Sequence, residues 1–426
     1  MKTVLVTGGL GYIGSHTAVD LIARGHRVVL ADNLNNTRAE VLDGIEAISG
    51  VRPEWVHVDL ADRSATEAFL AGRHFDGIIH FAAHKAVGES VAEPIAYYRN
   101  NFDSLLNLLD YQRAHPQCGL IFSSSCTVYG QADALPIPES APIKPAESPY
   151  GNTKQVGEEI LRDAVRAFNL KVIALRYFNP IGAHSSARIG ELPLGVPQNL
   201  VPFITQSAAG LRGPLQVYGN DYPTRDGTAI RDYIHVVDLA AAHVVALERI
   251  FNDSMAEAFE VFNLGTGEGS TVLEVIQSFE RATGASLQWS FAPRRAGDVI
   301  ATYADTHRAR NGTIYYKKPR YDNPGFDQMP NPPLEADGSM AYNCRCWLTP
   351  IMSLDAKKFF DFKGRIIPNA KIFNEWFSTS SKDRKIMAIG VRRYNAAMKK
   401  LRKGEKLEWA SMLDPVTGML LDEKQL

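Results

Sequence analysis

Cysteine is scarce in this sequence. Its 426 residues contain only four cysteines, and none of them lies at the spacing of a zinc ribbon: Cys118, Cys126, Cys344 and Cys346. A disulfide-stapled secreted scaffold needs a much denser cysteine framework than this. We therefore expect free thiols and no metal site.

Long apolar runs are also missing. No stretch reaches the roughly 18 apolar residues of a membrane-spanning helix, and the N-terminus opens into residues 3–7 without the layout of a secretory signal. We expect a cytoplasmic protein with no membrane partner. From Asn311 onward there are 20 Lys and Arg against 13 Asp and Glu. A solvated surface explains so modest an excess better than nucleic-acid binding, so we expect no nucleic-acid partner.

The sequence does contain a regular alternation of short β-branched runs and helical stretches. This alternation extends from residue 2 to residue 177 and is typical of βαβ units. The expected strands are at residues 3–7, 27–31, 55–58, 77–80, 119–123 and 171–176. Their apolar character suits strands that are covered on both faces. The pattern predicts an α/β fold with a Rossmann-type doubly wound parallel sheet.

Composition divides the chain into three regions. Residues 1–177 form the expected Rossmann domain, to which parts of 230–265 return. Residues 178–308 are richer in Pro and Gly and predict a smaller α/β substrate lobe, with helices at 237–251 and 272–283 and a strand at 260–264. Residues 311–426 form a basic C-terminal segment of different texture, with an amphipathic helix expected at 380–403.

A glycine pattern follows the first expected strand. Residues 9–14 read Gly-Leu-Gly-Tyr-Ile-Gly and open the first helix, which is the context of a dinucleotide fingerprint. The glycines let the backbone approach a pyrophosphate at the positive end of the helix. Asp32 ends the second strand 18 residues after Gly14, where a carboxylate accepts hydrogen bonds from ribose hydroxyls and repels a 2′-phosphate. This favours NAD over NADP, although Arg38 nearby keeps NADP open.

A second pattern predicts acid/base chemistry. Ser148 and Pro149 are typical of a helix start, after which Tyr150 and Lys154 share one helical face. We expect the Lys154 cation to favour the ionised Tyr150 phenol and so to lower its pKa toward working pH. Such a Tyr/Lys pair is common by chance on helix surfaces. Ser125, after the fifth strand, adds a hydroxyl at the sheet edge where these folds bind ligands.

Together these features resemble the extended short-chain dehydrogenase/reductase family, and within it the UDP-glucose 4-epimerases. The resemblance covers residues 1–308. Five runs carry it: Thr-Gly-Gly-Leu-Gly-Tyr-Ile-Gly-Ser-His at 7–16, Asp-Asn-Leu at 32–34, Ser-Pro-Tyr-Gly at 148–151, Arg-Tyr-Phe-Asn-Pro-Ile-Gly-Ala-His at 176–184 and Arg-Asp-Tyr-Ile-His at 231–235.

The resemblance implies a reaction and a role for each catalytic residue. Tyr150 acts as acid/base, Lys154 binds the nicotinamide ribose, and Ser125 relays the proton of the sugar 4-hydroxyl. Hydride passes from C4 to NAD and returns to the other face of a 4-keto intermediate, so UDP-glucose and UDP-galactose interconvert. We expect NAD to remain bound, a UDP-sugar as substrate and a homodimer as the working unit.

The remaining site residues follow from family position. The NAD site is expected at Gly8, Gly11, Tyr12, Ile13, Gly14, Asp32, Asn33, Leu34, Asn36, Thr37, Asp59, Leu60, Phe81, Ala82, Lys85, Asn100, Tyr150, Lys154 and Phe178. The UDP-sugar site is expected at Ser125, Asn179, Asn199, Leu200, Gln216, Tyr218, Arg231, Arg295 and Asp298, a set whose cations and amides suit phosphates and a base. Packing roles for Leu60 and Ala82, and a solvated Arg294-Arg295 pair, are the plainer alternatives.

Thr302 falls where some family members have a bulky aromatic residue that excludes N-acetylated sugars. We therefore also expect activity on UDP-GlcNAc and UDP-GalNAc. A nucleotide-sugar 4,6-dehydratase is the alternative enzyme, but its Asp-Glu couple is replaced here by Cys126-Thr127.

The family's closing helical segment does not follow Arg308. Residues 341–350 are instead similar to a closing motif of phage head-morphogenesis proteins, which makes a virion structural role the alternative for the C-terminal part. Our hypothesis is that residues 311–426 come from an unrelated gene by fusion or design. The enzyme part would then lack its last packing element and lose stability.

Overall fold

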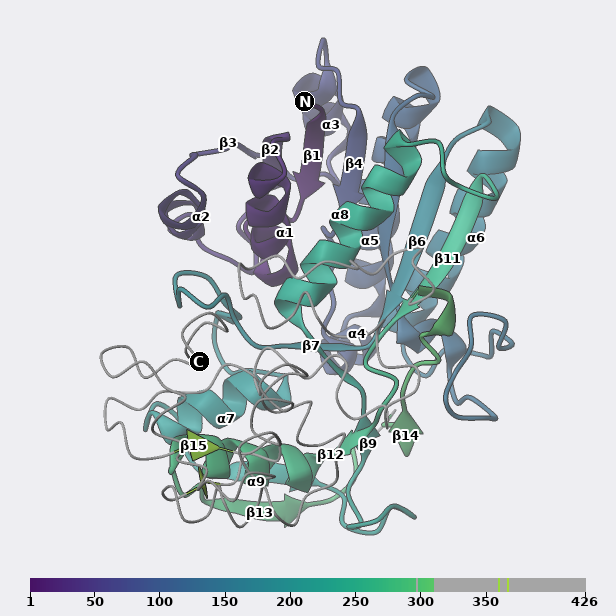
Figure 1. Cartoon of the computed structure of the whole chain (residues 1–426). Coiled ribbons are helices and arrows are strands. Elements are labelled where there is room, and N and C mark those ends of the chain that lie inside the picture. The colour runs from purple at the N-terminus through teal and green to yellow at the C-terminus, as the bar shows by residue number, and fades with distance from the viewer. Residues whose placement is uncertain (296–297, 310–358, 361–365, 368–426) are drawn as a thin grey trace, which may run out of the picture. The chain divides into compact units, whose positions relative to one another are not determined.

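A computed structural model describes residues 1–295, 298–309, 359–360 and 366–367 (Figure 1). It divides into two units. Of the second unit it describes two antiparallel strands, β15 (Phe359–Phe360) and β16 (Ile366–Ile367). The amphipathic helix expected at 380–403, the motif at 341–350, Cys344 and Cys346 lie outside the described residues, so the origin of the C-terminal segment stays a hypothesis.

The first unit is built on a seven-stranded sheet in which every pair is parallel. The strands run in the order β11-β6-β5-β4-β1-β2-β3, which confirms the predicted doubly wound topology. They are β1 (Thr3–Thr7), β2 (Arg27–Asp32), β3 (Glu54–His57), β4 (Gly77–His80), β5 (Gly119–Ser125), β6 (Val172–Tyr177) and β11 (Phe259–Leu264). The chain changes direction between β1 and β4, and ligands bind at such a switch point in open α/β sheets.

Helices cover both faces of this sheet. One apolar cluster joins one side of the strands to α1 (Tyr12–Ala23), α2 (Val41–Ser49) and α8 (Val236–Phe251). The other joins the opposite side to α3 (Arg63–Leu70), α5 (Pro94–Ala114) and α6 (Pro149–Phe168). Neighbouring strand residues such as Val4 and Leu5 belong to different clusters, because side chains alternate along a strand. Burial on both faces explains why the strands read as continuous apolar runs.

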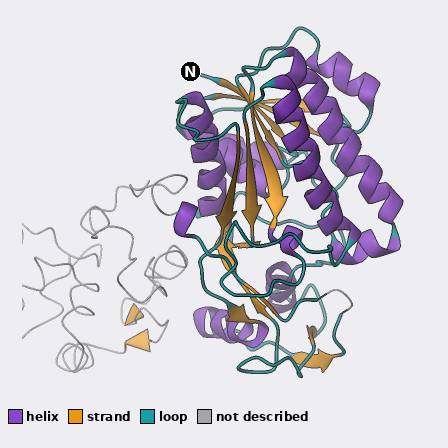
Figure 2. Cartoon of the chain, turned by 90° about the vertical axis from the view of Figure 1, so that its right-hand side faces the viewer, coloured by secondary structure: helices purple, strands orange, loops and turns teal. Residues whose placement is uncertain are grey.

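Smaller elements lie beyond the carboxyl ends of the large sheet, toward which the arrowheads point in Figure 2. They pair in three small sheets, β7 with β10, β8 with β13, and β9 between β12 and β14. Their bounds are α4 (Val87–Ala92), the short 3-10 helix η1 (Cys126–Tyr129), β7 (Asn179–Ile181), α7 (Leu200–Ala208), β8 (Leu215–Tyr218), β9 (Ile230–Arg231), β10 (Tyr233–His235), β12 (Ser270–Thr271), α9 (Val272–Thr283), β13 (Trp289–Ala292) and β14 (Ala301–Thr302).

Several local predictions are confirmed at the level of hydrogen bonds. The Ser148 hydroxyl caps α6 by accepting from the Gly151 N–H at 3.1 Å, with Pro149 in the first turn. Gly25 follows the end of α1 with a φ of +79°, which favours glycine. Within the described residues, no helix is long and apolar enough to cross a membrane.

Candidate active site

The glycine loop between β1 and α1 leaves no room for a side chain where Gly14 lies against Gly8. A Cβ atom built on Gly14 would lie 2.2 Å from the carbonyl oxygen of Gly8, whose own φ is +61°. Gly11 is the N-cap of α1, and no side-chain hydrogen bond caps this helix start in the described part of the chain. The backbone itself therefore faces any ligand, and the positive helix end favours a phosphate there.

Asp32 ties the end of β2 to this loop. Its carboxylate accepts hydrogen bonds from the backbone N–H groups of Leu10 at 3.1 Å and Leu34 at 2.9 Å. Burial raises the pKa of Asp32. Leu34 has a φ of +58°, an uncommon conformation for a branched residue that is enriched at functional sites. The Thr37 hydroxyl donates to the Leu10 carbonyl at 2.6 Å and closes the loop from the other side.

The end of β4 forms a wall that lies against the glycine loop. The backbone N–H groups of Phe81 and Ala82 donate to the carbonyl and the hydroxyl of Thr7, each at 3.2 Å. A Cβ atom on Gly8 would lie 3.0 Å from the Ala82 nitrogen, so the two loops are in contact. The predicted NAD residues at the ends of β1, β2 and β4 are thus brought together.

The other predicted NAD residues lie around this wall. Asn33 and the exposed Asn36 follow β2, while Asp59 and the buried Leu60 follow β3, so packing accounts for the Leu60 side chain. Ile13 packs on the core, and the Tyr12 hydroxyl donates to the Gly182 carbonyl at 2.6 Å.

Three more of them lie in the loop after β4, on α5 and directly after β6. The Lys85 ammonium is 3.5 Å from the Glu191 carboxylate, and the Asn100 amide donates to the Asn101 side-chain oxygen at 2.9 Å. Phe178 is buried beyond β6.

The three predicted catalytic residues are buried at the end of β5 and the start of α6. Ser125, Tyr150 and Lys154 are 6%, 7% and 5% exposed. Ser125 ends β5, where its hydroxyl accepts from the Thr127 N–H at 3.2 Å, and its side chain lies close enough to the Tyr150 phenol to lower the phenol's pKa. The Lys154 ammonium donates to the Ser123 carbonyl at 2.8 Å and lies 5.9 Å from the centre of the Tyr150 ring.

One electrostatic expectation is wrong for the protein alone. Burial raises the pKa of Tyr150, the Tyr177 hydroxyl raises it further, and the hydrogen bond to Ser125 only partly offsets them. Burial also lowers the pKa of Lys154 to about 8. The expectation holds for a Tyr150–Lys154 pair exposed to water on a helix surface. Here both side chains are buried, and removal from water disfavours the charged form of both groups.

The sequence reasoning missed two polar residues that support this trio. Tyr177 ends β6, and its hydroxyl is 2.8 Å from that of Ser123. Asn101 on α5 accepts from the His84 N–H at 2.8 Å and donates to the Thr153 hydroxyl at 3.0 Å, linking the loop after β4 to α6. A polar residue on the buried face of a helix is the signal that marks Asn101.

Most of the predicted substrate residues gather in the small sheets. The Arg231 guanidinium donates to the Val299 carbonyl at 2.9 Å and pairs with Asp298 at 3.5 Å. Asp298 also accepts from Arg295 at 3.0 Å, and Arg295 stacks 5.0 Å above the centre of the Tyr218 ring. Tyr218 and Gln216 are the exposed alternate residues of β8. The described residues thus hold two guanidiniums, one carboxylate and one ring together.

The last predicted substrate residues lie nearer the large sheet. Asn179 begins β7, and its N–H donates to the Asp232 carbonyl at 2.9 Å. Asn199 precedes α7, which starts at Leu200, and its amide donates to Glu191 at 2.5 Å.

Asp232 was not predicted, although it is fully buried beside Arg231. Its carboxylate accepts from the Thr266 hydroxyl at 2.6 Å and the Ala304 N–H at 3.1 Å, and so joins three loops.

Comparisons with known proteins agree with this geometry. The sequence profile of the NAD dependent epimerase/dehydratase family matches residues 4–265. The UDP-glucose 4-epimerase of Bacillus subtilis (strain 168) is 48% identical over 308 residues, which cover 72% of this chain and 90% of that protein. The UDP-glucose 4-epimerase of Yersinia pestis is 48% identical over 309 residues, with coverage of 72% and 90%.

Solved structures lead to the same family. The UDP-glucose 4-epimerase from Bifidobacterium longum in complex with NAD+ and UDP is 45% identical, with a TM-score of 0.71 and coverage of 74% of this chain and 94% of that one. The UDP-Glc/GlcNAc 4-epimerase from Campylobacter jejuni is 35% identical, with a TM-score of 0.63 and coverage of 76% and 95%. Profile, sequence and fold agree, and the chain belongs to the NAD dependent epimerase/dehydratase family.

Proposed function

We propose that this chain interconverts UDP-glucose and UDP-galactose by NAD-dependent epimerisation at C4, a reaction of galactose metabolism. The observation that carries the proposal is the burial of Ser125, Tyr150 and Lys154 together at the carboxyl end of β5, the edge of the sheet that also carries the glycine loop. Relatives named as UDP-glucose 4-epimerases support the substrate.

The residues present fit NAD. The glycine loop excludes any Cβ atom next to the Gly8 carbonyl, and the uncapped start of α1 suits a pyrophosphate. The Asp32 carboxylate suits ribose hydroxyls and would repel a 2′-phosphate. Lys154 and Asn100 are the candidates for the nicotinamide side. When bound, NAD supplies the hydride acceptor and a positive charge close to the Tyr150 phenol.

The chain's own residues handle the proton. The Ser125 side chain lies close enough to the Tyr150 phenol to lower its pKa, so a proton can move from a sugar hydroxyl through Ser125 to Tyr150. The Lys154 cation favours the phenolate once the cofactor's charge offsets the cost of burial. Burial of all three side chains keeps water away from a 4-keto intermediate.

The small sheets form the proposed UDP site of the substrate lobe, residues 178–308. Arg231 and Arg295 supply charge for the diphosphate, and the Tyr218 ring offers a stacking surface for uracil. Asp298 pairs with both arginines and keeps their guanidiniums oriented.

We also propose that N-acetylated UDP-sugars are accepted. Thr302 on β14 is a small, buried side chain close to Cys126, the residue directly after Ser125. A compact residue here leaves room beside the sugar that an aromatic ring would fill. The Campylobacter jejuni relative is named for both sugar types. Protein that epimerises UDP-glucose but leaves UDP-GlcNAc untouched would contradict this.

The residues that a 4,6-dehydratase needs for elimination are missing at the matching positions of this chain. Elimination needs an acid/base pair where this chain has Cys126 and Thr127, and burial raises the pKa of Cys126 to about 11. The thiol is therefore neutral at working pH and provides no base.

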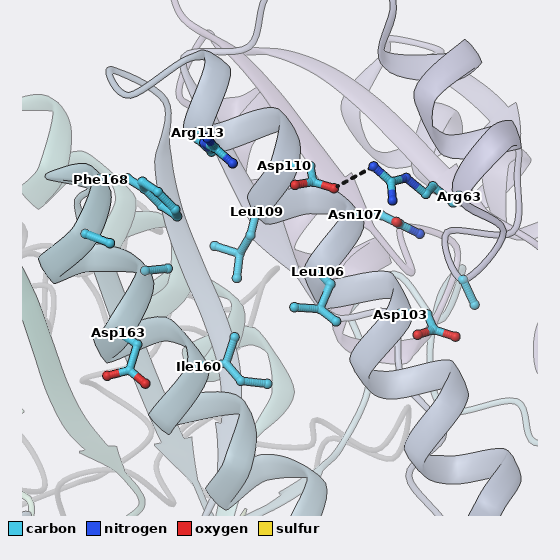
Figure 3. Close-up of a pocket in the computed structure, with 13 residues that line it drawn as sticks. Arg63, Asp103, Leu106, Asn107, Leu109, Asp110, Arg113, Ile160, Asp163 and Phe168 are labelled. Atoms are coloured by element: carbon cyan, nitrogen blue, oxygen red, sulfur yellow. Dashed lines mark ion pairs between the residues drawn. The ribbon is translucent and has the colours of Figure 1, made fainter.

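A homodimer is proposed from a groove between α5 and α6 (Figure 3). The groove has a volume of about 690 Å³ and mixes apolar residues with charges of both signs. The apolar lining includes Leu106, which is 45% exposed, and Phe168, which is 39% exposed. Two arginines face three aspartates around it, Arg63 and Arg113 with Asp103, Asp110 and Asp163. Such a face is self-complementary across a two-fold axis.

The cytoplasm is the compartment we propose, consistent with free thiols at Cys118 and Cys126.

For the first test of function, we would incubate the full chain with UDP-galactose, without added NAD, and follow UDP-glucose formation. Tyr150→Phe keeps the ring and removes the acid/base hydroxyl. We expect turnover in the wild type and a loss of about 10²- to 10⁴-fold in the variant, with bound NAD retained. Equal activity in both would contradict the assignment of Tyr150.

A further inference from the structure

A buried ion pair lies behind the three catalytic side chains. Glu158 on α6 and Arg176 on β6 are each 2% exposed. The guanidinium donates twice to the carboxylate, from Nε to Oε1 at 2.8 Å and from Nη2 to Oε2 at 2.6 Å. Burial disfavours the charge of Arg176, but the hydrogen bonds and charge of Glu158 outweigh it and raise the pKa of Arg176. The Arg176 guanidinium therefore keeps its charge, and its two hydrogen bonds hold it in one geometry against Glu158.

Each side of the pair adjoins a catalytic residue. The Ser124 hydroxyl donates to Glu158 Oε1 at 2.7 Å, and Ser124 immediately precedes Ser125 on β5. Glu158 lies one helical turn after Lys154 and two turns after Tyr150, on the same face of α6. Arg176 is the register partner of Ser124 in the sheet. The ion pair joins α6 to β6, and the Ser124 hydrogen bond joins the pair to β5, so α6 and the strand that carries Ser125 are tied together.

The far side of Arg176 continues the network past Ser125. Its Nη1 donates to the Tyr129 hydroxyl at 3.0 Å, and that hydroxyl donates to Asn263 Oδ1 at 2.6 Å. Tyr129 ends η1, the turn that starts directly after Ser125. Ser125 is therefore held from both sides of the chain, by Ser124 before it and by η1 after it.

We propose that Glu158 and Arg176 are positioning residues that keep the Ser125 hydroxyl in place against Tyr150. A buried ion pair is weak evidence for stability, because apolar residues of the same volume often replace such pairs without loss. What an apolar pair does not provide is a fixed register between β5, α6 and β6. This inference rests on the catalytic roles proposed above, and it predicts an effect on kcat rather than on nucleotide binding.

The chain offers a matched control at the other end of the sheet. Glu260 is 1% exposed and accepts from Arg249 at 2.7 and 2.9 Å, in the same two-bond geometry. Glu260 lies near the start of β11, whereas the proposed positioning pair lies at the carboxyl ends of β5 and β6. Glu260→Gln therefore removes a comparable buried charge without touching the catalytic elements.

The test compares Glu158→Gln, Ser124→Ala and Glu260→Gln in the full chain with its cofactor. We would measure kcat, KM for UDP-galactose, bound NAD and Tm for each. Both glutamate variants should lower Tm, but only Glu158→Gln should lower kcat, by between about 10- and 100-fold. KM should stay within about threefold, because the arginines of the UDP site are untouched. Ser124→Ala keeps the ion pair, so it should lower kcat by a smaller factor at near wild-type Tm.

Two results would overturn the proposal. One is a kcat within about twofold of wild type in Glu158→Gln or, if that variant does not fold, in Ser124→Ala. The other is an equal loss of kcat in Glu158→Gln and Glu260→Gln, which would make the pair merely structural. An inactive wild type would instead reject the proposed function, and the positioning role with it.

Discussion

Lys154 is a cation placed where water does not reach. It is 5% exposed, and burial lowers its pKa from 10.5 to about 8. The cost of burying the charge is fully present below about pH 8, where folded and unfolded chains are both protonated. Between pH 8 and 10.5 the folded chain loses its proton first, so its stability rises through this window.

Lys154→Met should expose this cost. From about pH 7 to about pH 10, the unfolding free energy of the cofactor-free wild type should rise by about 2 to 3 kcal/mol relative to the variant. Urea unfolding of both proteins at the two pH values measures it. A difference that does not change with pH would mean that folding does not shift the pKa of Lys154. The variant should also lose turnover, because the Lys154 charge that destabilises the fold is the charge that the reaction needs.

At this scale the sequence identified side chains that the fold brings together, but it did not predict their pKa values. The glycines, Asp32, Ser125 and Tyr150 stand out because strand, turn and helix signals lie next to them in the chain. Asn101 and Asp232 were missed because their partners lie far along the chain, 52 residues away for Thr153 and 34 for Thr266. The raised pKa of Tyr150 was missed for a related reason, since burial is a property of the folded chain.

At the scale of elements, the contact between β1, α1 and β4 carries the cofactor site that we propose. Gly14→Ala should separate this contact, because the new Cβ atom would meet backbone at 2.2 Å rather than a flexible side chain. We expect a purified variant with most of its bound NAD lost, measured by absorbance after extraction. Gly213→Ala, where nothing lies within 4 Å, is the control and should keep its NAD. A full complement of NAD in Gly14→Ala would refute the proposed cradle.

The ends of the strands were predicted less accurately than their positions in the chain. The prediction for β5 stopped at Ser123, but the strand continues to Ser125, with both further serines buried. Serines in the sequence suggest a turn, whereas here the Ser124 hydroxyl donates to Glu158 and the Ser125 hydroxyl accepts from the Thr127 N–H. The predicted start of β3 was one residue late, at Trp55 instead of Glu54. The strands that are covered on both faces were predicted correctly, because their buried residues form continuous apolar runs in the sequence.

At the scale of the whole molecule, the groove between α5 and α6 predicts the oligomeric state. Leu106→Asp places a charge on a side chain that is 45% exposed in the groove and should convert a dimer to monomers. Sedimentation velocity measures this directly. Leu211→Asp is the control, since Leu211 is 71% exposed and does not line the groove. Unchanged dimers in Leu106→Asp would place the interface elsewhere.

The central claim is that hydride leaves and returns at C4 within one site, with no net use of NAD. The most direct measurement is to supply UDP-galactose carrying deuterium at C4 and to determine where the label is in the UDP-glucose formed. Return of the same hydride predicts full retention of deuterium at C4, in ordinary water and without added cofactor. Loss of the label to solvent would contradict hydride return, and so would its appearance in released NADH.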